Sequence, residues 1–114
     1  MCIRDRWSVV YKIKDFATLC GCSIYTLRYY DEIGLLKPKI VSHDSGYRYY
    51  TEKQIFQYIE IKEFQEIGFS IQEIKDIQGL NDKEIAKLIL KKVNYLQSRL
   101  EKSIVLMGKY IERS

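Results

Sequence analysis

The sequence predicts a mainly α-helical fold, in which a winged helix-turn-helix head with a β-hairpin wing precedes one long C-terminal helix. Three observations lead to this prediction. Two short apolar-periodic segments are joined at Gly21, as in a helix-turn-helix. A hairpin pattern follows between residues 40 and 50. Apolar side chains then recur at four-three spacing from Ala86 to Tyr110, which is typical of a coiled-coil helix.

Length and composition indicate one small globular unit. The chain has 114 residues, of which 46% are hydrophobic and 30% charged, with a net charge of +4. These values are ordinary for a soluble protein, and no apolar run approaches the roughly 20 residues needed to cross a bilayer. We therefore expect a cytoplasmic protein without a membrane partner. Cys2, Cys20 and Cys22 fit neither a disulfide framework nor a zinc module, so neither a metal nor another cofactor is expected.

Residues 1–10 show neither helical nor strand periodicity, and we expect a disordered or non-native tail. One hypothesis is that the natural chain starts at Val10, which is read as Met when GUG initiates translation. The alternative is that Arg4 and Arg6 form a basic arm on DNA, held to the head by Trp7. Deleting the tail separates the two, because only the second hypothesis predicts a loss of DNA affinity.

The head is expected over residues 11–80 and begins with the helix-turn-helix. Residues 11–20 form a short helix that Gly21 ends, and Ser23 caps the next helix. The outer face of this second helix offers a cation and hydroxyl groups, which suit a major groove. The candidate DNA contacts are Ser23, Tyr25, Thr26, Arg28 and Tyr29. Asp31 and its neighbour Glu32 repel phosphate, so contact is expected at the front of the helix. The alternative is a tyrosine-rich core with cations at its edge.

The wing is expected to be a β-hairpin, because Pro38 excludes a helix and turn residues separate two short strands. Strand alternation places Tyr47 and Tyr49 on one face and Arg48 on the other. One face must pack on the helices, since an isolated two-stranded hairpin is barely stable. The candidate DNA contacts of the wing and the segment before it are Lys37, Lys39, Tyr47, Arg48 and Tyr49.

Three capping boxes open the remaining helices, at Thr51, Ser70 and Asn81, each with Gln or Glu three residues later. The first of these helices is expected to end at about Ile67. Its predicted apolar stripe consists of Ile55, Ile59 or Tyr58, Phe64 and Ile67. The turn after it forms a possible second wing, in which Phe69 and Ser70 are candidate DNA contacts.

The last helix, expected over residues 81–114, is long enough to need a partner. About thirty residues at 1.5 Å each extend roughly 45 Å. Its apolar stripe has no partner left within the chain, so we expect it to pair with a second copy. The candidate dimerisation residues are Ile89, Val93, Leu96, Leu100 and Met107. The alternative is an amphipathic helix that folds back on the head.

Taken together, these residues resemble the MerR family of bacterial transcription regulators, most closely its multidrug-sensing branch. The resemblance rests on the stretches Thr26–Asp31, Gly34–Pro38, Tyr47–Tyr50 and Ile67–Ile71, in this order. It implies a homodimer joined by antiparallel long helices, whose heads bind double-stranded promoter DNA at successive major grooves. Such regulators distort promoters whose elements are too widely spaced for RNA polymerase.

We therefore expect a sequence-specific transcription regulator and not an enzyme, since no paired carboxylates, Cys/His couple or glycine-rich phosphate loop is evident. Drug sensors of the family continue into a ligand-binding domain and metal sensors carry cysteines after the long helix begins. Neither pattern occurs here, so no sensor is expected. The alternatives are an architectural DNA-bending factor of the excisionase type and a coiled-coil interaction module with a vestigial head.

Overall fold

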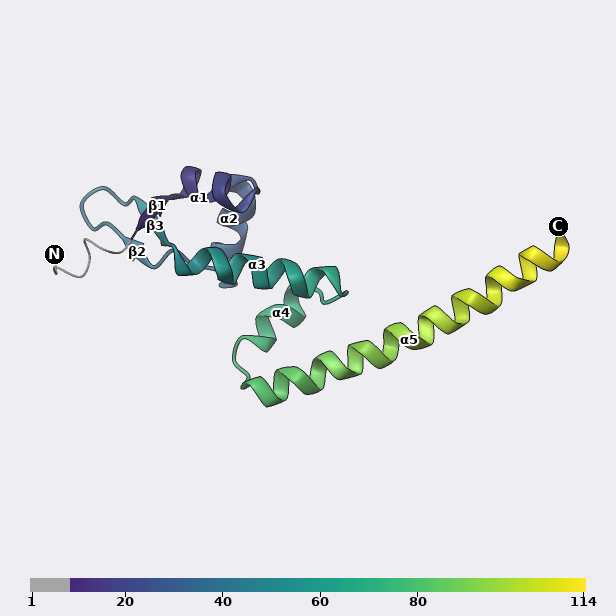
Figure 1. Cartoon of the computed structure of the whole chain (residues 1–114). Helices are drawn as coiled ribbons and strands as arrows, with labels where there is room; N and C mark the ends of the chain where they lie inside the picture. The colour runs from purple at the N-terminus through teal and green to yellow at the C-terminus, as the bar shows by residue number, and fades with distance from the viewer. Residues whose placement is uncertain (1–8) are drawn as a thin grey trace. The chain divides into compact units, whose positions relative to one another are not determined.

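The computed structural model describes residues 9–114, which divide after Lys75 into two compact units. The hypotheses on residues 1–8 lie outside the described part of the chain. As the sequence predicts, the structure is mainly helical, with a small antiparallel sheet in the first unit and one long C-terminal helix in the second (Figure 1).

The sheet has three strands, one more than the predicted hairpin. Strands β1 (Val10–Lys12), β2 (Ile40–Val41) and β3 (Arg48–Thr51) are arranged in the order β1-β3-β2, and both pairings are antiparallel. In β1, Tyr11 lies opposite Tyr50. The prediction of a helix from residue 11 is therefore wrong for its first two residues, and Val10 belongs to a strand. Local periodicity does not reveal β1, because its pairing partner is far along the chain.

The helix-turn-helix consists of α1 (Ile13–Cys20) and α2 (Ile24–Glu32). Gly21 ends α1 with φ = 73°, a left-handed conformation that costs glycine little. Ser23 caps α2, since its Oγ accepts a hydrogen bond of 3.1 Å from the backbone N–H of Thr26. The predicted helix end at Gly21 and the predicted N-cap at Ser23 are thus confirmed.

Two further helices complete this region. At the start of α3 (Lys53–Glu66) the predicted capping box is half formed: the Oε1 atom of Gln54 accepts from the N–H of Thr51 at 3.0 Å, but no side chain caps the helix. The box before α4 (Ile71–Ile77) is complete. There Ser70 Oγ accepts from Glu73 N–H at 3.1 Å, and Glu73 Oε1 accepts from Ser70 N–H at 2.9 Å.

The buried face of α3 agrees only in part with the predicted stripe. Phe64 is buried, and so is Tyr58, the predicted alternative to Ile59. Ile59 is 47% exposed and Ile67 is 37% exposed, whereas Ile61, outside the predicted stripe, is buried. The reason is Gln54, which is 1% exposed and begins the buried face as a polar residue. Its amide hydrogen-bonds to backbone groups outside the helix, so both polar atoms of the buried side chain have a partner. A stripe traced from apolar residues alone misses a face that starts with glutamine.

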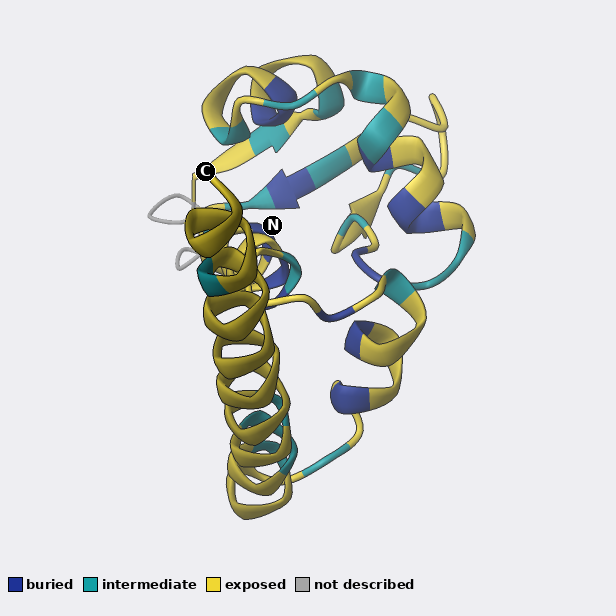
Figure 2. Cartoon of the chain, turned by 90° about the vertical axis from the view of Figure 1, so that its right-hand side faces the viewer, coloured by how far each residue is buried: buried dark blue, intermediate teal, exposed yellow. Residues whose placement is uncertain are grey.

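The core of the first unit is strongly aromatic. The rings of Phe16 and Tyr50 stack with centroids 4.4 Å apart and planes 9° apart, and neither residue is exposed. Tyr30 and Tyr58 are also buried, with ring centroids 6.4 Å apart. Figure 2 shows the buried positions on the helices and on β3. The alternative of a tyrosine-rich core therefore holds for Tyr30 and Tyr50.

The second unit is dominated by α5 (Asp82–Arg113), a helix of 32 residues. Asn81 and Glu84 form the predicted capping box at its start. No residue of α5 is buried, and Figure 2 shows exposed positions along its whole length. No helix within residues 9–114 has both the length and the apolarity to cross a bilayer.

Candidate nucleic-acid interface

The outer face of α2 carries the side chains that the sequence places there. Tyr25 is 78% exposed and Tyr29 is 50% exposed, and Arg28 is exposed between them. Leu27 and Tyr30 are buried and hold α2 to the core. Arg28 thus stands on a firmly packed helix, as a side chain that reads a groove requires. The hydroxyl groups of Ser23 and Thr26 lie 3.1 Å apart at the start of the same helix.

Asp31, near the C-terminal end of α2, brings together one cation of the wing and one of the segment before it. Its Oδ2 atom accepts a hydrogen bond from Nη1 of Arg48, on β3. Its Oδ1 atom lies 3.3 Å from Nζ of Lys37, which also donates to the backbone carbonyl of Asp31 at 3.0 Å. The sequence identified both cations as candidate contacts but did not identify the carboxylate that links them.

These groups surround a cavity of about 660 Å³ between α2 and the wing. Three of its lining side chains are cations, from Arg28, Lys37 and Arg48, and two are carboxylates, from Asp31 and Glu32. Positive groups therefore exceed negative ones by one. A phosphate or a base edge that enters here meets three N–H-bearing cations, from α2, from the segment after it and from β3. Ile13, Gly46 and Tyr47 complete the lining.

Lys12 is a cation of this face that sequence reasoning missed. Its Nζ lies 4.8 Å from the ring centroid of Tyr47, which is 56% exposed. The contact was not predicted, because Lys12 was expected to lie in a helix over residues 11–20. Only the pairing of β1 with β3 brings Lys12 beside the wing. The sequence signal was the isolated Val-Tyr-Lys segment before the first helix.

The remaining candidates occupy different environments. Lys39 is exposed before β2, and Tyr49 is half-buried in the central strand. Ser70 is exposed and caps α4. Phe69 is only 6% exposed and packs edge-on against Phe64, with ring centroids 5.3 Å apart. Its side chain therefore belongs to the core and has little surface for DNA, in contrast to the prediction.

Burial favours the neutral forms of Tyr50 and Cys20 in this unit. It raises the pKa of Tyr50 to about 12, with a further contribution from the charge of Asp31. Burial also raises the pKa of the Cys20 thiol to about 11, so this free cysteine is a poor nucleophile at neutral pH. Within residues 9–114, no cluster of three or more His, Cys, Asp or Glu side chains could hold a metal ion.

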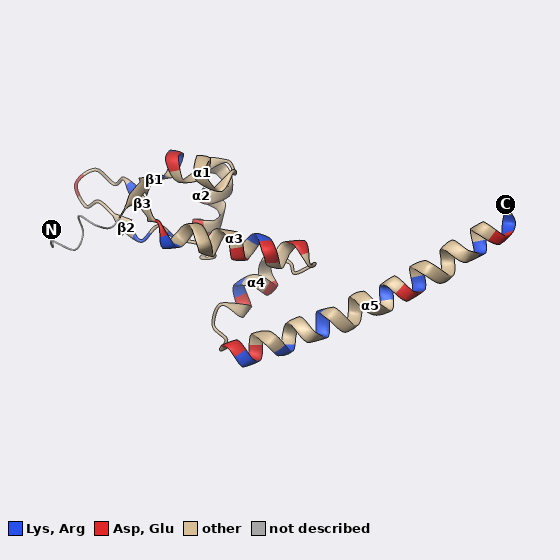
Figure 3. Ribbon diagram, in the orientation of Figure 1, with Lys and Arg blue, Asp and Glu red and all other residues tan. Residues whose placement is uncertain are grey.

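Charges of both signs are spread along the chain. Figure 3 shows acidic and basic positions on α3 as well as on α5. The positive groups at the α2–wing cavity are therefore a few placed cations and not part of a broadly basic molecule. This arrangement fits recognition through defined contacts better than a diffuse attraction to polyanions.

The fold defines the class: a winged helix-turn-helix protein with a long helix after its head. The model of the "MerR HTH family regulatory protein" matches residues 11–80, and the chain belongs to this family. The Multidrug-efflux transporter 1 regulator of Bacillus subtilis is 37% identical over 110 residues, which cover 90% of this chain. The chain spans 39% of that regulator's length.

Solved structures agree with this assignment. The N-terminal part of the Bacillus subtilis multidrug transporter activator, MtaN, superposes with a TM-score of 0.75 at 31% identity, covering 90% of this chain and 95% of that one. EcmrR in the cryo-EM structure of an EcmrR-DNA complex in EcmrR-RPo gives a TM-score of 0.70 at 28% identity. That match covers 90% of this chain and 39% of EcmrR. The named relatives are regulators, which agrees with the expectation that the chain is not an enzyme.

Proposed function

We propose that the chain acts as a homodimeric, sequence-specific transcription regulator that binds double-stranded promoter DNA and distorts it. The observation that carries the proposal is the α2–wing cavity, where Arg28 of the exposed helix and Arg48 of the wing share one opening. A winged helix-turn-helix places its second helix in the major groove and its wing on the flanking backbone. Membership of the MerR family and the likeness to DNA-bound EcmrR support this use of the surface.

In this arrangement the exposed residues divide between two tasks. Arg28, with Tyr25 and Tyr29, faces the groove, whereas Lys37, Lys39 and the wing face the backbone. The side chains proposed to contact DNA are Ser23, Tyr25, Thr26, Arg28, Tyr29, Lys37, Lys39, Tyr47, Arg48, Tyr49 and Ser70. Phosphate contacts set the position on the duplex, and base contacts select the sequence.

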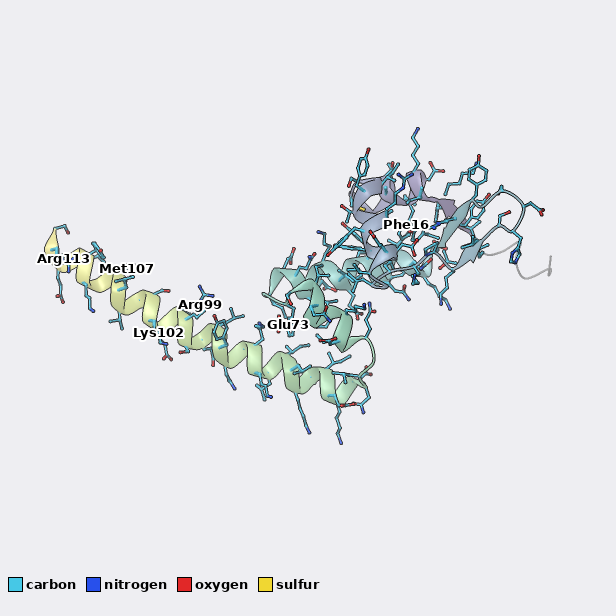
Figure 4. All side chains as sticks on the ribbon, turned by 180° about the vertical axis from the view of Figure 1, so that it is seen from behind. Phe16, Glu73, Arg99, Lys102, Met107 and Arg113 are labelled. Atoms are coloured by element: carbon cyan, nitrogen blue, oxygen red, sulfur yellow. The ribbon has the colours of Figure 1, made fainter. Side chains whose placement is uncertain are left out.

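The homodimer is proposed from α5. Val93 and Leu96 are each 41% exposed, Leu100 is 61% exposed and Met107 is 55% exposed, and with Ile89 they follow one four-three stripe. Figure 4 shows the Met107 side chain extending outward from the helix. An apolar stripe of this length needs cover, and two α5 helices in antiparallel pairing provide it. RNA polymerase at the promoter is the further proposed partner, which places the protein in the bacterial cytoplasm.

The test begins with selection of bound duplexes from fragments of the source genome, including the region upstream of the gene itself. Transcription from a selected promoter is then measured with purified bacterial RNA polymerase, with and without the protein. A changed transcript level supports a regulator. Binding and bending without any change in transcript level favours the excisionase-type alternative, and the absence of any selected duplex contradicts both.

A further inference from the structure

Asp31 holds two cations of the α2–wing cavity from a nearly buried position. The residue is 8% exposed, and each of its carboxylate oxygens has its own cation: Arg48 at Oδ2 and Lys37 at Oδ1. These cations come from β3 and from the segment after α2. A single carboxylate therefore fixes the spacing between two parts of the interface that are distant in sequence.

Both cations remain available to a ligand. The side chain of Arg48 is 52% exposed and that of Lys37 is 64% exposed, and both line the cavity with Arg28. A guanidinium has five N–H donors and an ammonium has three. Contact with Asp31 uses one nitrogen of Arg48, so donors are left over for a phosphate.

The backbone beneath these side chains is fixed as well. Buried Gln54 donates from Nε2 to the carbonyl of Lys37 and accepts at Oε1 from the N–H of Thr51, the last residue of β3. Gln54 thus ties the backbone of the Lys37 segment to the end of the wing. Asp31 adds the link between their side chains, so the cations have little freedom to adjust to an ill-fitting duplex.

A carboxylate at this place also opposes anions. Its negative charge near the C-terminal end of α2 weakens the attraction of the cavity for any phosphate. Binding to non-specific DNA depends mainly on the number of positive charges, whereas operator binding also depends on their placement. A negative charge that weakens non-specific binding and also fixes the placement of the two cations increases the preference for the operator over non-specific DNA.

We propose that Asp31 is a positioning residue that raises the preference for operator over non-specific DNA, by holding Lys37 and Arg48 in register while opposing indiscriminate phosphate binding. This inference rests on the proposed DNA-binding function. It adds a positioning role to the expectation that Asp31 repels phosphate at the end of α2. Without the carboxylate, the two cations are free to follow any backbone, and operator contacts lose their defined geometry.

The experiment compares the full chain with its Asp31→Asn variant on a selected operator duplex and on a scrambled duplex of equal length, over a range of salt concentrations. The matched control is Glu32→Gln, because Glu32 lines the same cavity but has no ion pair among the described residues. Asp31→Asn should bind the scrambled duplex more tightly and the operator more weakly. Its preference should fall at least about tenfold, or about 1.4 kcal/mol. Glu32→Gln should strengthen binding to both duplexes by similar factors, and Asp31→Glu should restore part of the preference.

The idea is wrong if Asp31→Asn keeps its preference, if Glu32→Gln loses as much preference, or if both affinities of a folded Asp31→Asn fall together. If thermal melting shows that Asp31→Asn does not fold, Arg48→Lys decides. It retains the charge but lacks the forked guanidinium, so scrambled-duplex affinity should persist while preference falls. An unchanged preference in Arg48→Lys overturns the proposal. If the unaltered chain binds neither duplex, the proposed function itself fails.

Discussion

Replacing Leu96 and Leu100 by Glu tests the dimer proposed from α5. Burying a leucine side chain fully is worth roughly 1.5–3 kcal/mol. Since Leu96 is 41% exposed and Leu100 is 61% exposed in the single chain, about half of that value is available at each position. The two leucines of both protomers together should contribute about 3–6 kcal/mol to association. Their replacement should therefore weaken dimerisation about 10²–10⁴-fold.

Sedimentation over a concentration series provides the measurement. The matched control is Val105→Glu, because Val105 is 62% exposed, close to the value for Leu100, but lies on the opposite side of α5 from the stripe. We expect dimers for the unaltered chain and for Val105→Glu, and monomers or aggregates for the double variant. Monomeric behaviour of the unaltered chain at micromolar concentration contradicts the proposed dimer, and equal damage from Val105→Glu contradicts the proposed interface.

Four further variants probe the head. Arg48→Ala should lower the log-log salt slope of operator binding by about one unit, as for a lost phosphate contact. Arg28→Ala should also relax sequence preference, at a cost of about 1–3 kcal/mol in operator binding. Equal operator binding by both variants and the unaltered chain contradicts the assignment of these two contacts. Phe16→Ala removes a fully buried ring stacked on Tyr50 and should lower the free energy of unfolding, measured by urea denaturation, by about 3–5 kcal/mol. A loss below about 1 kcal/mol, the level of a surface substitution, contradicts a core position for this ring. The pKa of Tyr50 rises from its ordinary value of 10 to about 12 on folding, so the stabilisation from its neutral form is complete below pH 10 and is lost as the pH rises to 12. Tyr50→Phe should reduce the fall of melting temperature between pH 10 and 12. An unaltered dependence of melting temperature on pH contradicts the assignment of this fall to Tyr50.

Elements with strong local signals could be predicted from the sequence. Gly21 and Ser23 mark the turn between α1 and α2 through backbone conformation and a side-chain cap, both of which depend only on near neighbours. The capping boxes at Ser70 and Asn81 formed for the same reason. The four-three stripe of α5 needed no tertiary information to predict its helix.

The features that the sequence did not predict depend on contacts between distant segments. Strand β1 exists because it pairs with β3, and its three residues carry no periodic signal of their own. Gln54 is buried because backbone groups of two other segments satisfy its amide, which makes a polar residue part of the core. Asp31 lies next to residues that form the interface, but its pairing with both cations follows from the wing's position against α2.

We propose that two copies of this chain hold one duplex through the α2–wing cavity of each head. The most direct measurement is sedimentation of the chain with a labelled operator duplex, combined with a hydroxyl-radical footprint of the same complex. We expect two chains per duplex and two protected half-sites related by an imperfect palindrome, with protection lost in Arg48→Ala. One chain per duplex, a single protected half-site, or a footprint that Arg48→Ala leaves unchanged contradicts it.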